Sequence, residues 1–173
     1  MLRIDPRLWL IALFTLLATA CGGAGKGPVQ PNGQKVAIVL EADRNLTGLE
    51  EARATQVNQL ADFQEGDLLA LLLKAGYEPA RGTDAGAQPG PGRYLLKTKI
   101  VKYNPGSAAA RMWVGFGAGA AALDLHYDLI GPNGTAYTQG DLHVASGRDW
   151  RKAARRVNIL TVQAVNTRLA QGL

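Results

Sequence analysis

The sequence has a single cysteine, Cys21, in 173 residues, so no disulfide within one chain can hold the fold together. Serine and histidine are almost as scarce: Ser107, Ser146, His126 and His143 are the only ones. A serine hydrolase would have to use these residues, but neither serine stands in a Gly-x-Ser-x-Gly turn, and Ser146 falls on the opposite face of an extended chain from His143. The sequence therefore predicts no catalytic residues and no cofactor, and a protein that is not an enzyme.

The sequence also lacks a hydrophobic run long enough to cross a bilayer. Its longest apolar stretch, Leu8 to Ala18, has eleven residues, whereas a membrane-spanning helix needs about 20. The stretch follows Arg3 and Arg7 and ends at small residues before Cys21, which is the pattern of a cleaved secretory signal peptide. Residues 1–20 are therefore predicted to be removed on export.

Cys21 directly follows the small residues at the end of the apolar run and has no second cysteine to pair with. The stretch resembles a bacterial lipobox, which implies fatty acylation of Cys21 and attachment to a membrane. Gly22 stands where an aspartate would resemble the inner-membrane retention signal, so the outer membrane, with the domain facing the periplasm, is favoured. The alternative is ordinary cleavage after Ala20, which would leave a free thiol.

Two segments are predicted after residue 20. The range 21–34 is rich in glycine and proline and is predicted to be a flexible tether spanning roughly 20 Å, whereas 35–173 is long enough for one domain. Without Arg3, Asp5 and Arg7 the chain carries seventeen basic and thirteen acidic residues, a net charge of +4. This charge suits an anionic envelope surface, and an exported protein so mildly basic is not predicted to bind nucleic acid.

Three stretches alternate between apolar and polar residues, which predicts half-buried strands. In the first, Tyr94, Leu96, Thr98 and Ile100 share one face, with Lys97, Lys99 and Tyr103 on the other. In the next, Leu123 to Leu129 alternates with Asp124, His126 and Asp128 and reaches the hairpin signal Pro132-Asn133-Gly134, beyond which Leu142 and Val144 continue the pattern. The shorter run at 35–41 is apolar throughout, which predicts a central strand covered on both faces.

Two helices are predicted. One runs from about Gln59 to Ala75, buries leucines and ends at Gly76, although Gly66 allows a start as late as Asp67. The second follows Ser146 to Asp149, which has capping-box spacing, and repeats apolar residues every three or four positions from Trp150. The segment 78–92 has three prolines and four glycines and is predicted to be a long surface loop.

The resulting order is β-α-β-β-β-α. It predicts an α+β fold in which two helices pack on one face of a small, mainly antiparallel sheet.

Several of these residues carry a family resemblance: Tyr94, Ile100, 103–107, Arg111, the glycines of 115–119 and the turn at Asn133-Gly134. With them the chain resembles a family of bacterial lipoproteins known as domain of unknown function 4410, over about 36–169. The resemblance implies an envelope lipoprotein of this architecture. By analogy with similar lipoproteins, it implies an accessory part of an assembly, transport or secretion system, with an envelope protein as partner.

The hairpin is predicted to gather Asp124, His126, Asp128, Asp141 and His143 on one sheet face, with His126 opposite Asp141 and Asp124 opposite His143. These ligand types could hold a metal ion and support a metal-dependent activity. The alternative is a solvent-facing surface whose charges pair across strands. The sequence shows no further ligand cluster, so no metal site is predicted.

Two other places are candidates for contact with partners. The link between the first two alternating strands carries Arg111, Met112, Trp113 and Phe116, more apolar surface than a turn requires, and is predicted either to fold back on the core or to contact a partner or membrane. A basic cluster opens the last helix, and it is either a solvated face or a contact for anionic lipid or the cell wall. The cluster comprises Arg148, Arg151, Lys152, Arg155 and Arg156.

Overall fold

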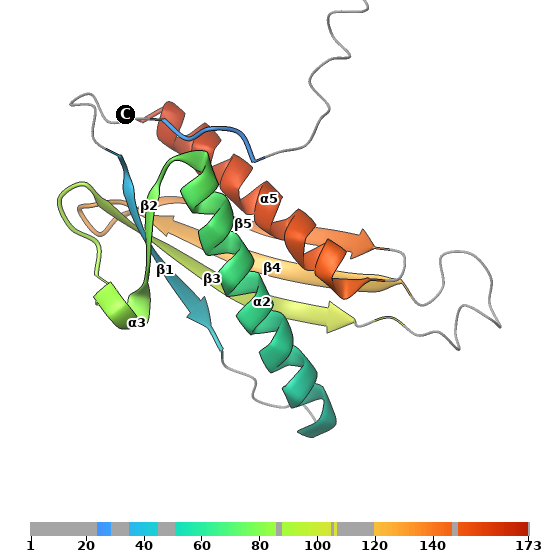
Figure 1. Cartoon of the computed structure of the whole chain (residues 1–173). Coiled ribbons are helices and arrows are strands. Elements are labelled where there is room, and N and C mark those ends of the chain that lie inside the picture. The colour runs from blue at the N-terminus through green and yellow to red at the C-terminus, as the bar shows by residue number, and fades with distance from the viewer. Residues whose placement is uncertain are drawn as a thin grey trace, which may run out of the picture.

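The protein folds as two helices against one face of a five-stranded sheet (Figure 1). The computed structural model describes residues 24–28, 35–44, 51–85, 88–104, 106, 120–146 and 149–172, without the side chains of 51–55, 84 and 85. The elements follow the order β1 (Ala37–Asp43), α2 (Glu51–Ala75), β2 (Glu78–Arg81), α3 (Gly82–Ala85), β3 (Arg93–Asn104), β4 (Ala121–Ile130), β5 (Ala136–Ser146) and α5 (Trp150–Ala170).

The sheet is mixed, which corrects the prediction of a mainly antiparallel one. Its strand order is β2-β1-β3-β4-β5. β1 runs parallel to both β2 and β3, whereas β3, β4 and β5 are antiparallel neighbours. The parallel half arises because β1 returns to β2 through α2, a crossover that a two-residue turn could not make.

Strand β2 was not predicted, and the expectation of a surface loop over 78–92 was wrong at its start. Glu78 to Arg81 pair with Ala37 to Leu40 of β1, and Gly82 to Ala85 then form the short α3. Only four residues pair, and Pro79 stands among them, which is tolerated because β2 lies at the edge of the sheet. β1 therefore lies inside the sheet, as predicted, with Ile38, Val39 and Leu40 buried.

Helix α2 begins at Glu51, eight residues before the predicted start, and continues through Gly66. The expected leucines are buried, with Leu60, Leu68 and Leu72 fully inaccessible. Gly76 ends the helix at φ 99°, and the Gly76 and Tyr77 amides donate to the Leu73 and Leu72 carbonyls. This left-handed glycine is the predicted C-terminal stop.

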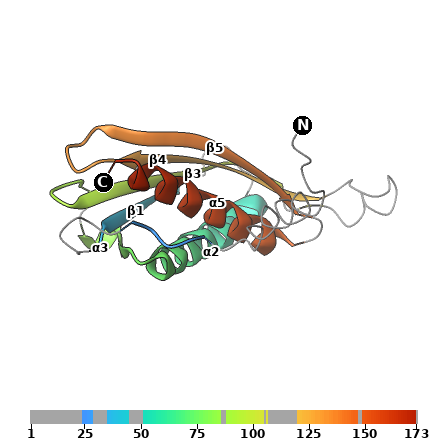
Figure 2. The same cartoon turned by 90° about the horizontal axis from the view of Figure 1, so that it is seen from above.

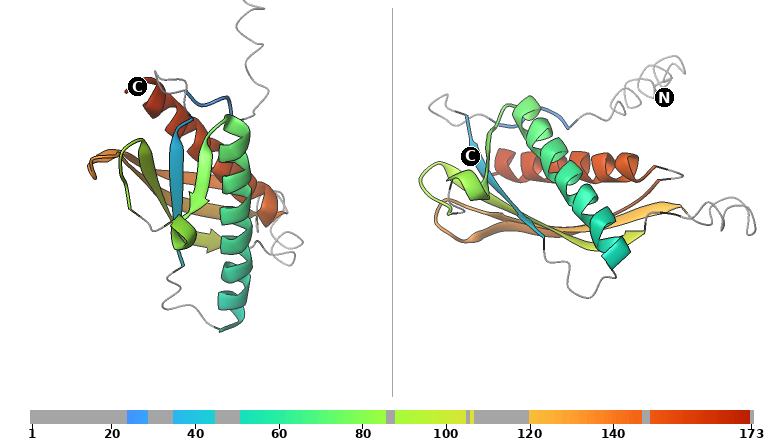
Figure 3. Two further views of the ribbon diagram at one scale, coloured as in Figure 1. Left: turned by 60° about the vertical axis from the view of Figure 1, so that its left-hand side comes forward. Right: turned by 60° about the horizontal axis from the view of Figure 1, so that its bottom comes forward.

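Both long helices lie on the same side of the sheet (Figure 2). Apolar side chains from β1, β3, β4, α2 and α5 form one core, and a second cluster joins Leu60 and Leu125 to Val157 nearer the start of α5. Phe63 of α2 meets Trp150 of α5 edge to face, with ring centroids 5.5 Å apart. The opposite side of the sheet carries no helix in the part of the chain that is described (Figure 3).

Helix α5 confirms the predicted periodicity but not its predicted cap. Asp149 is the N-cap, and its side chain accepts from the Arg151 amide, whereas Ser146 still belongs to β5. Ala153, Val157 and Val165 lie on the buried stripe, and a polar residue, Asn158, shares it.

Candidate functional site

The open face of the sheet carries charged side chains in rows across four strands. The strand registers place opposite charges side by side at most positions of these rows, although Lys99 lies opposite His126. Lys97 pairs with Glu41 at 3.5 Å and Lys99 with Asp43 at 3.1 Å. A hollow of about 220 Å³ lies over this part of the face, lined by residues of β1, β3 and β4. The rows consist of Glu41, Lys97 and Asp128; Asp43, Lys99, His126 and Asp141; and Lys102, Asp124 and His143.

Both histidines lie in these rows, at the predicted register. His126 is opposite Asp141 and Asp124 opposite His143. The Nδ1 atom of His126 lies 2.7 Å from Asp141 Oδ1, and its Nε2 lies 3.4 Å from Asp128 Oδ2. His143 Nδ1 bonds to Asp124 in the same way. The predicted hairpin pairing is therefore confirmed.

The same geometry does not favour a metal centre. Asp141 and Asp128 bond to opposite nitrogens of the His126 ring, so the two carboxylates do not converge on one position. Among the described residues, no group of three or more His, Cys, Asp or Glu side chains is placed to hold a metal ion. The rows form a network of ion pairs that is exposed to solvent.

Tyr103 leaves this face, contrary to prediction. The register between β3 and β4 shifts between Ile100 and Lys102, which brings Tyr103 opposite Leu123 and against the second core cluster. Burial raises the pKa of its phenol. A bulge of this kind inserts one unpaired residue and so moves the following side chains to the other face.

The hydrogen bond to Asp141 raises the pKa of His126, and the charge of Asp128 adds to the effect. Below the unfolded-state pKa of about 6.5 the protonated pair stabilises the fold, and this contribution is lost as the pH rises through the raised value. Because the pair lies at the surface, its contribution stays below ~1 kcal/mol. A change of pH therefore alters the charge of this face more than it alters the stability of the fold.

We expect Asp141→Asn to lower the pKa of His126, because the largest cause of the rise is removed. An NMR titration of the imidazole Cε1 proton measures the change. Asp124→Asn is the matched control, since Asp124 bonds to His143 instead. An unchanged His126 titration in the Asp141 variant would contradict the assignment of this pair.

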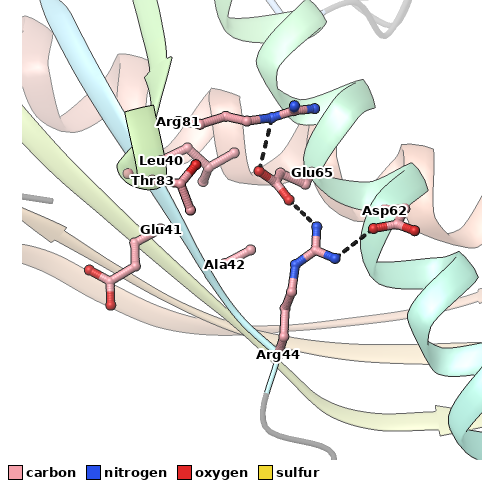
Figure 4. A pocket seen from close by; sticks show the side chains of 9 residues that line it. Leu40, Glu41, Ala42, Arg44, Asp62, Glu65, Arg81 and Thr83 are labelled. Atoms are coloured by element: carbon pink, nitrogen blue, oxygen red, sulfur yellow. Dashed lines mark hydrogen bonds and ion pairs between the residues drawn. The ribbon is translucent and has the colours of Figure 1, made fainter. Parts of the chain in front are cut away.

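A second site, not predicted from the sequence, lies where β1 and β2 end beside α2. It is a crevice of about 570 Å³ that includes Arg44, Glu65, Arg81 and Thr83 in its lining (Figure 4). Such a position, outside the carboxyl ends of parallel strands, is where open sheets commonly bind ligands.

Glu65 of α2 is the centre of this crevice. Its side chain is only 10% exposed and lies between two guanidinium groups, with Arg81 Nε 3.1 Å from one carboxylate oxygen and Arg44 bonded to the other. Arg44 also donates to Asp62 at 2.6 Å. Glu65 and then Asp62 raise the pKa of Arg44. The two arginines neutralise the charge of Glu65, which in turn links the ends of β1 and β2 to α2. Both arginine side chains remain about half exposed.

The basic cluster lies on the first turns of α5. Arg151, Lys152, Arg155 and Arg156 are exposed there. Arg155 pairs with Asp67 of α2, and the Arg151 guanidinium lies 4.5 Å from the centre of the Trp150 ring. The remaining predicted contacts fall outside the described residues: Arg148, the loop residues Arg111, Met112, Trp113 and Phe116, and Cys21. Their roles stay predictions, as does the division of the chain at residues 20 and 34.

The family described as "Domain of unknown function (DUF4410)" matches residues 46–154, well over half of the chain. The chain belongs to this family. This confirms the family resemblance seen in the strands and the Asn133-Gly134 turn. Comparison with curated proteins gave no match.

The fold of this DUF4410 protein is similar to that of PelC from Paraburkholderia phytofirmans. A structure of a PelC point variant, described as a dodecamer, superposes with a TM-score of 0.52 at 14% identity, covering 82% of this chain and 94% of that one. A second PelC dodecamer structure gives a TM-score of 0.46 at 16% identity over 83% and 92% of the two chains. At this identity the likeness shows the fold alone.

Proposed function

We propose that this DUF4410 protein is a lipid-anchored, non-catalytic binding module of the bacterial cell envelope, accessory to an assembly, transport or secretion system. Its sequence supports the envelope location through the charged start, the short apolar run and Cys21 after small residues. We place it at the outer membrane, facing the periplasm. No described helix is long and apolar enough to cross a membrane.

The observation that carries the binding role is the open face of the sheet. Two helices cover one face, whereas the other presents fixed rows of opposite charge across β1, β3, β4 and β5. The ion pairs favour one arrangement of these side chains before a partner binds, and preorganisation of this kind lowers the entropic cost of binding. Rows that carry charges of both signs set the register of a partner more than they add affinity.

The partner that best fits this face is a second copy of the chain. Because the rows carry both signs, the face can complement itself under a two-fold rotation, as the interface of a symmetric dimer must. The PelC structure of the same fold is described as a dodecamer, which supports assembly of identical chains as the mode of action.

Reversing two charges on the face is expected to abolish this self-association. Lys97→Glu combined with Lys99→Glu removes the two described lysine ion pairs of the face and places like charges beside Glu41 and Asp43. Light scattering after size-exclusion chromatography of residues 22–173, at several protein and salt concentrations, measures the mass. The wild type should exceed one chain, and the variant should not.

The control is Lys152→Glu, an exposed charge on α5 away from the sheet face. It should leave the mass unchanged, and both variants should melt within a few degrees of the wild type because exposed pairs contribute little stability. A wild-type protein that is monomeric under all conditions, or a doubly reversed variant as large as the wild type, contradicts self-association through this face.

A further inference from the structure

The segment just after Cys21 lies against the domain instead of extending freely from it. Residues 24–28, the described part of the predicted tether, run along the end of α2 and the last third of α5 (Figure 1). The Gly27 amide donates to the Ala75 carbonyl at 2.8 Å. The Asn166 side-chain amide donates to the carbonyls of Gly25 and Ala24 at 3.3 and 3.4 Å. We call residues 24–28 the strap.

Tyr77 provides the surface on which the strap lies. Its ring is 1% exposed and its hydroxyl donates to Asn166 Oδ1 at 2.6 Å, so the residue that holds the strap is itself fixed. A Cβ on Gly27 would overlap the Tyr77 ring, which means that only glycine permits this approach. Ala24 packs against the main core at the other end of the strap. The contacts therefore come from the end of α2 and from α5.

This docking shortens the free linker to the anchor. The predicted tether has fourteen residues, from 21 to 34, but only Gly22 and Gly23 separate Cys21 from the strap. Three peptide units span at most ~11 Å. The polar layer on each side of a bilayer is roughly 5 to 8 Å thick. A lipid on Cys21 would therefore hold Ala24, and the pole of the domain around it, at the level of the headgroups.

The last turn of α2 lies at the same end of the domain, where the Ala75 carbonyl accepts from Gly27 of the strap. Leu73 there is 61% exposed, one of the two large apolar side chains so exposed among the described residues. Lys74 follows it, and Lys26 on the strap is exposed as well. An apolar side chain flanked by lysines suits an interface of lipid tails and anionic headgroups, because the ammonium groups reach the phosphates while Leu73 enters the layer below.

We propose that the strap seats the domain on the lipid surface in one orientation, with Leu73 in the bilayer interface and Lys26 and Lys74 against anionic headgroups. The proposal rests on the proposed lipid anchor at Cys21. It adds that Cys21 is connected to the domain through the docked strap and not through a flexible linker. The open sheet face, which lies on the side away from the helices, is then left accessible to protein partners.

Spin labels on the full lipidated protein test this orientation in vesicles of phosphatidylethanolamine and phosphatidylglycerol. With Cys21 acylated, a single introduced cysteine labels cleanly. Leu73→Cys should be accessible to dissolved oxygen and shielded from a water-soluble nickel relaxing agent. Val101→Cys is the matched control, because Val101 is 60% exposed but lies on β3 of the sheet. It is made together with Lys97→Glu and Lys99→Glu, so that a second copy of the chain does not cover the sheet face. It should show the reverse accessibility.

Vesicle flotation separates this proposal from the anchor itself. If the protein floats but labels at 73 and 101 are equally exposed to nickel, the orientation is wrong and the anchor stands. If a label at Lys152 is shielded while that at 73 is not, the basic face of α5 contacts the lipid and the proposal is overturned. A protein that does not float contradicts the anchor, and with it the orientation.

A pair of glycine substitutions tests the strap. Gly27→Ala should release it, because the new methyl group would overlap the Tyr77 ring, and nickel should then reach the label at 73 although the protein still floats. Gly25→Ala is the matched control, since its Cβ would meet Asn166 at an ordinary 3.7 Å. If Gly27→Ala leaves the label as shielded as Gly25→Ala does, the strap does not orient the domain.

Discussion

Replacing Asn158 with leucine is expected to lower the free energy of unfolding by about 2 to 3 kcal/mol, because it leaves buried polar partners unsatisfied. Asn158 is fully buried between the two helices. Its amide nitrogen donates to the Gln64 carbonyl and to Asp67 Oδ2, both at 3.0 Å, and its oxygen accepts from Gln64 Nε2 at 3.2 Å. Leucine has a similar shape, so the loss is of hydrogen bonds and not of volume.

Thermal unfolding measures this change, with a fall of roughly 10 °C expected for a domain of this size. The double variant Gln64→Leu with Asn158→Leu is the control. Gln64 is 2% exposed, and replacing it as well removes the side-chain amide that Asn158→Leu leaves unsatisfied, although the Gln64 backbone carbonyl and Asp67 Oδ2 still lack the Asn158 donor. The double variant should therefore be more stable than the Asn158 variant alone. The double variant could instead lose as much free energy of unfolding as Gln64→Leu and Asn158→Leu lose together when made singly. That result would show that the two side chains do not stabilise the helix pair through their mutual hydrogen bond.

The sequence could predict the elements whose burial follows a simple period. β4 and β5 alternate along their length, and β3 does so up to its bulge after Ile100, while the Asn133-Gly134 turn sets the register that pairs His126 with Asp141. Gly134 has φ 80°, the conformation that this turn needs from its glycine. This part of the candidate site was therefore readable from sequence, because one hairpin contains it.

Other features depend on contacts between distant segments. β2 has only four residues, one of them a proline, so its sequence is too short to show an alternating pattern. It forms because its backbone pairs with β1. Asn158 lies on the buried stripe of α5, where its polar partners are Gln64 and Asp67, 94 and 91 residues away in the chain. The Arg44–Glu65–Arg81 crevice likewise joins β1, α2 and β2, and none of the three residues is distinguished by its neighbours in sequence.

The largest expected effect on location is that of Cys21→Ser. The wild type should be found with the outer-membrane fraction, and the variant should move to the soluble periplasmic fraction, because the lipid supplies almost all of the attachment. One exposed leucine and two lysines contribute far less than acyl chains, each buried CH₂ of which adds about 0.8 kcal/mol. Fractionation followed by immunoblotting measures the distribution. A variant that stays with the membrane as completely as the wild type would contradict anchoring through this residue.

The mass of the N-terminal peptide tests the anchored-module account most directly. The protein, purified from membranes and digested, should yield a first peptide that begins at Cys21 and carries the added mass of acyl chains. Residues 1–20 should be absent. A peptide that begins at Met1, or one that begins at Cys21 with an unmodified thiol, would contradict the account.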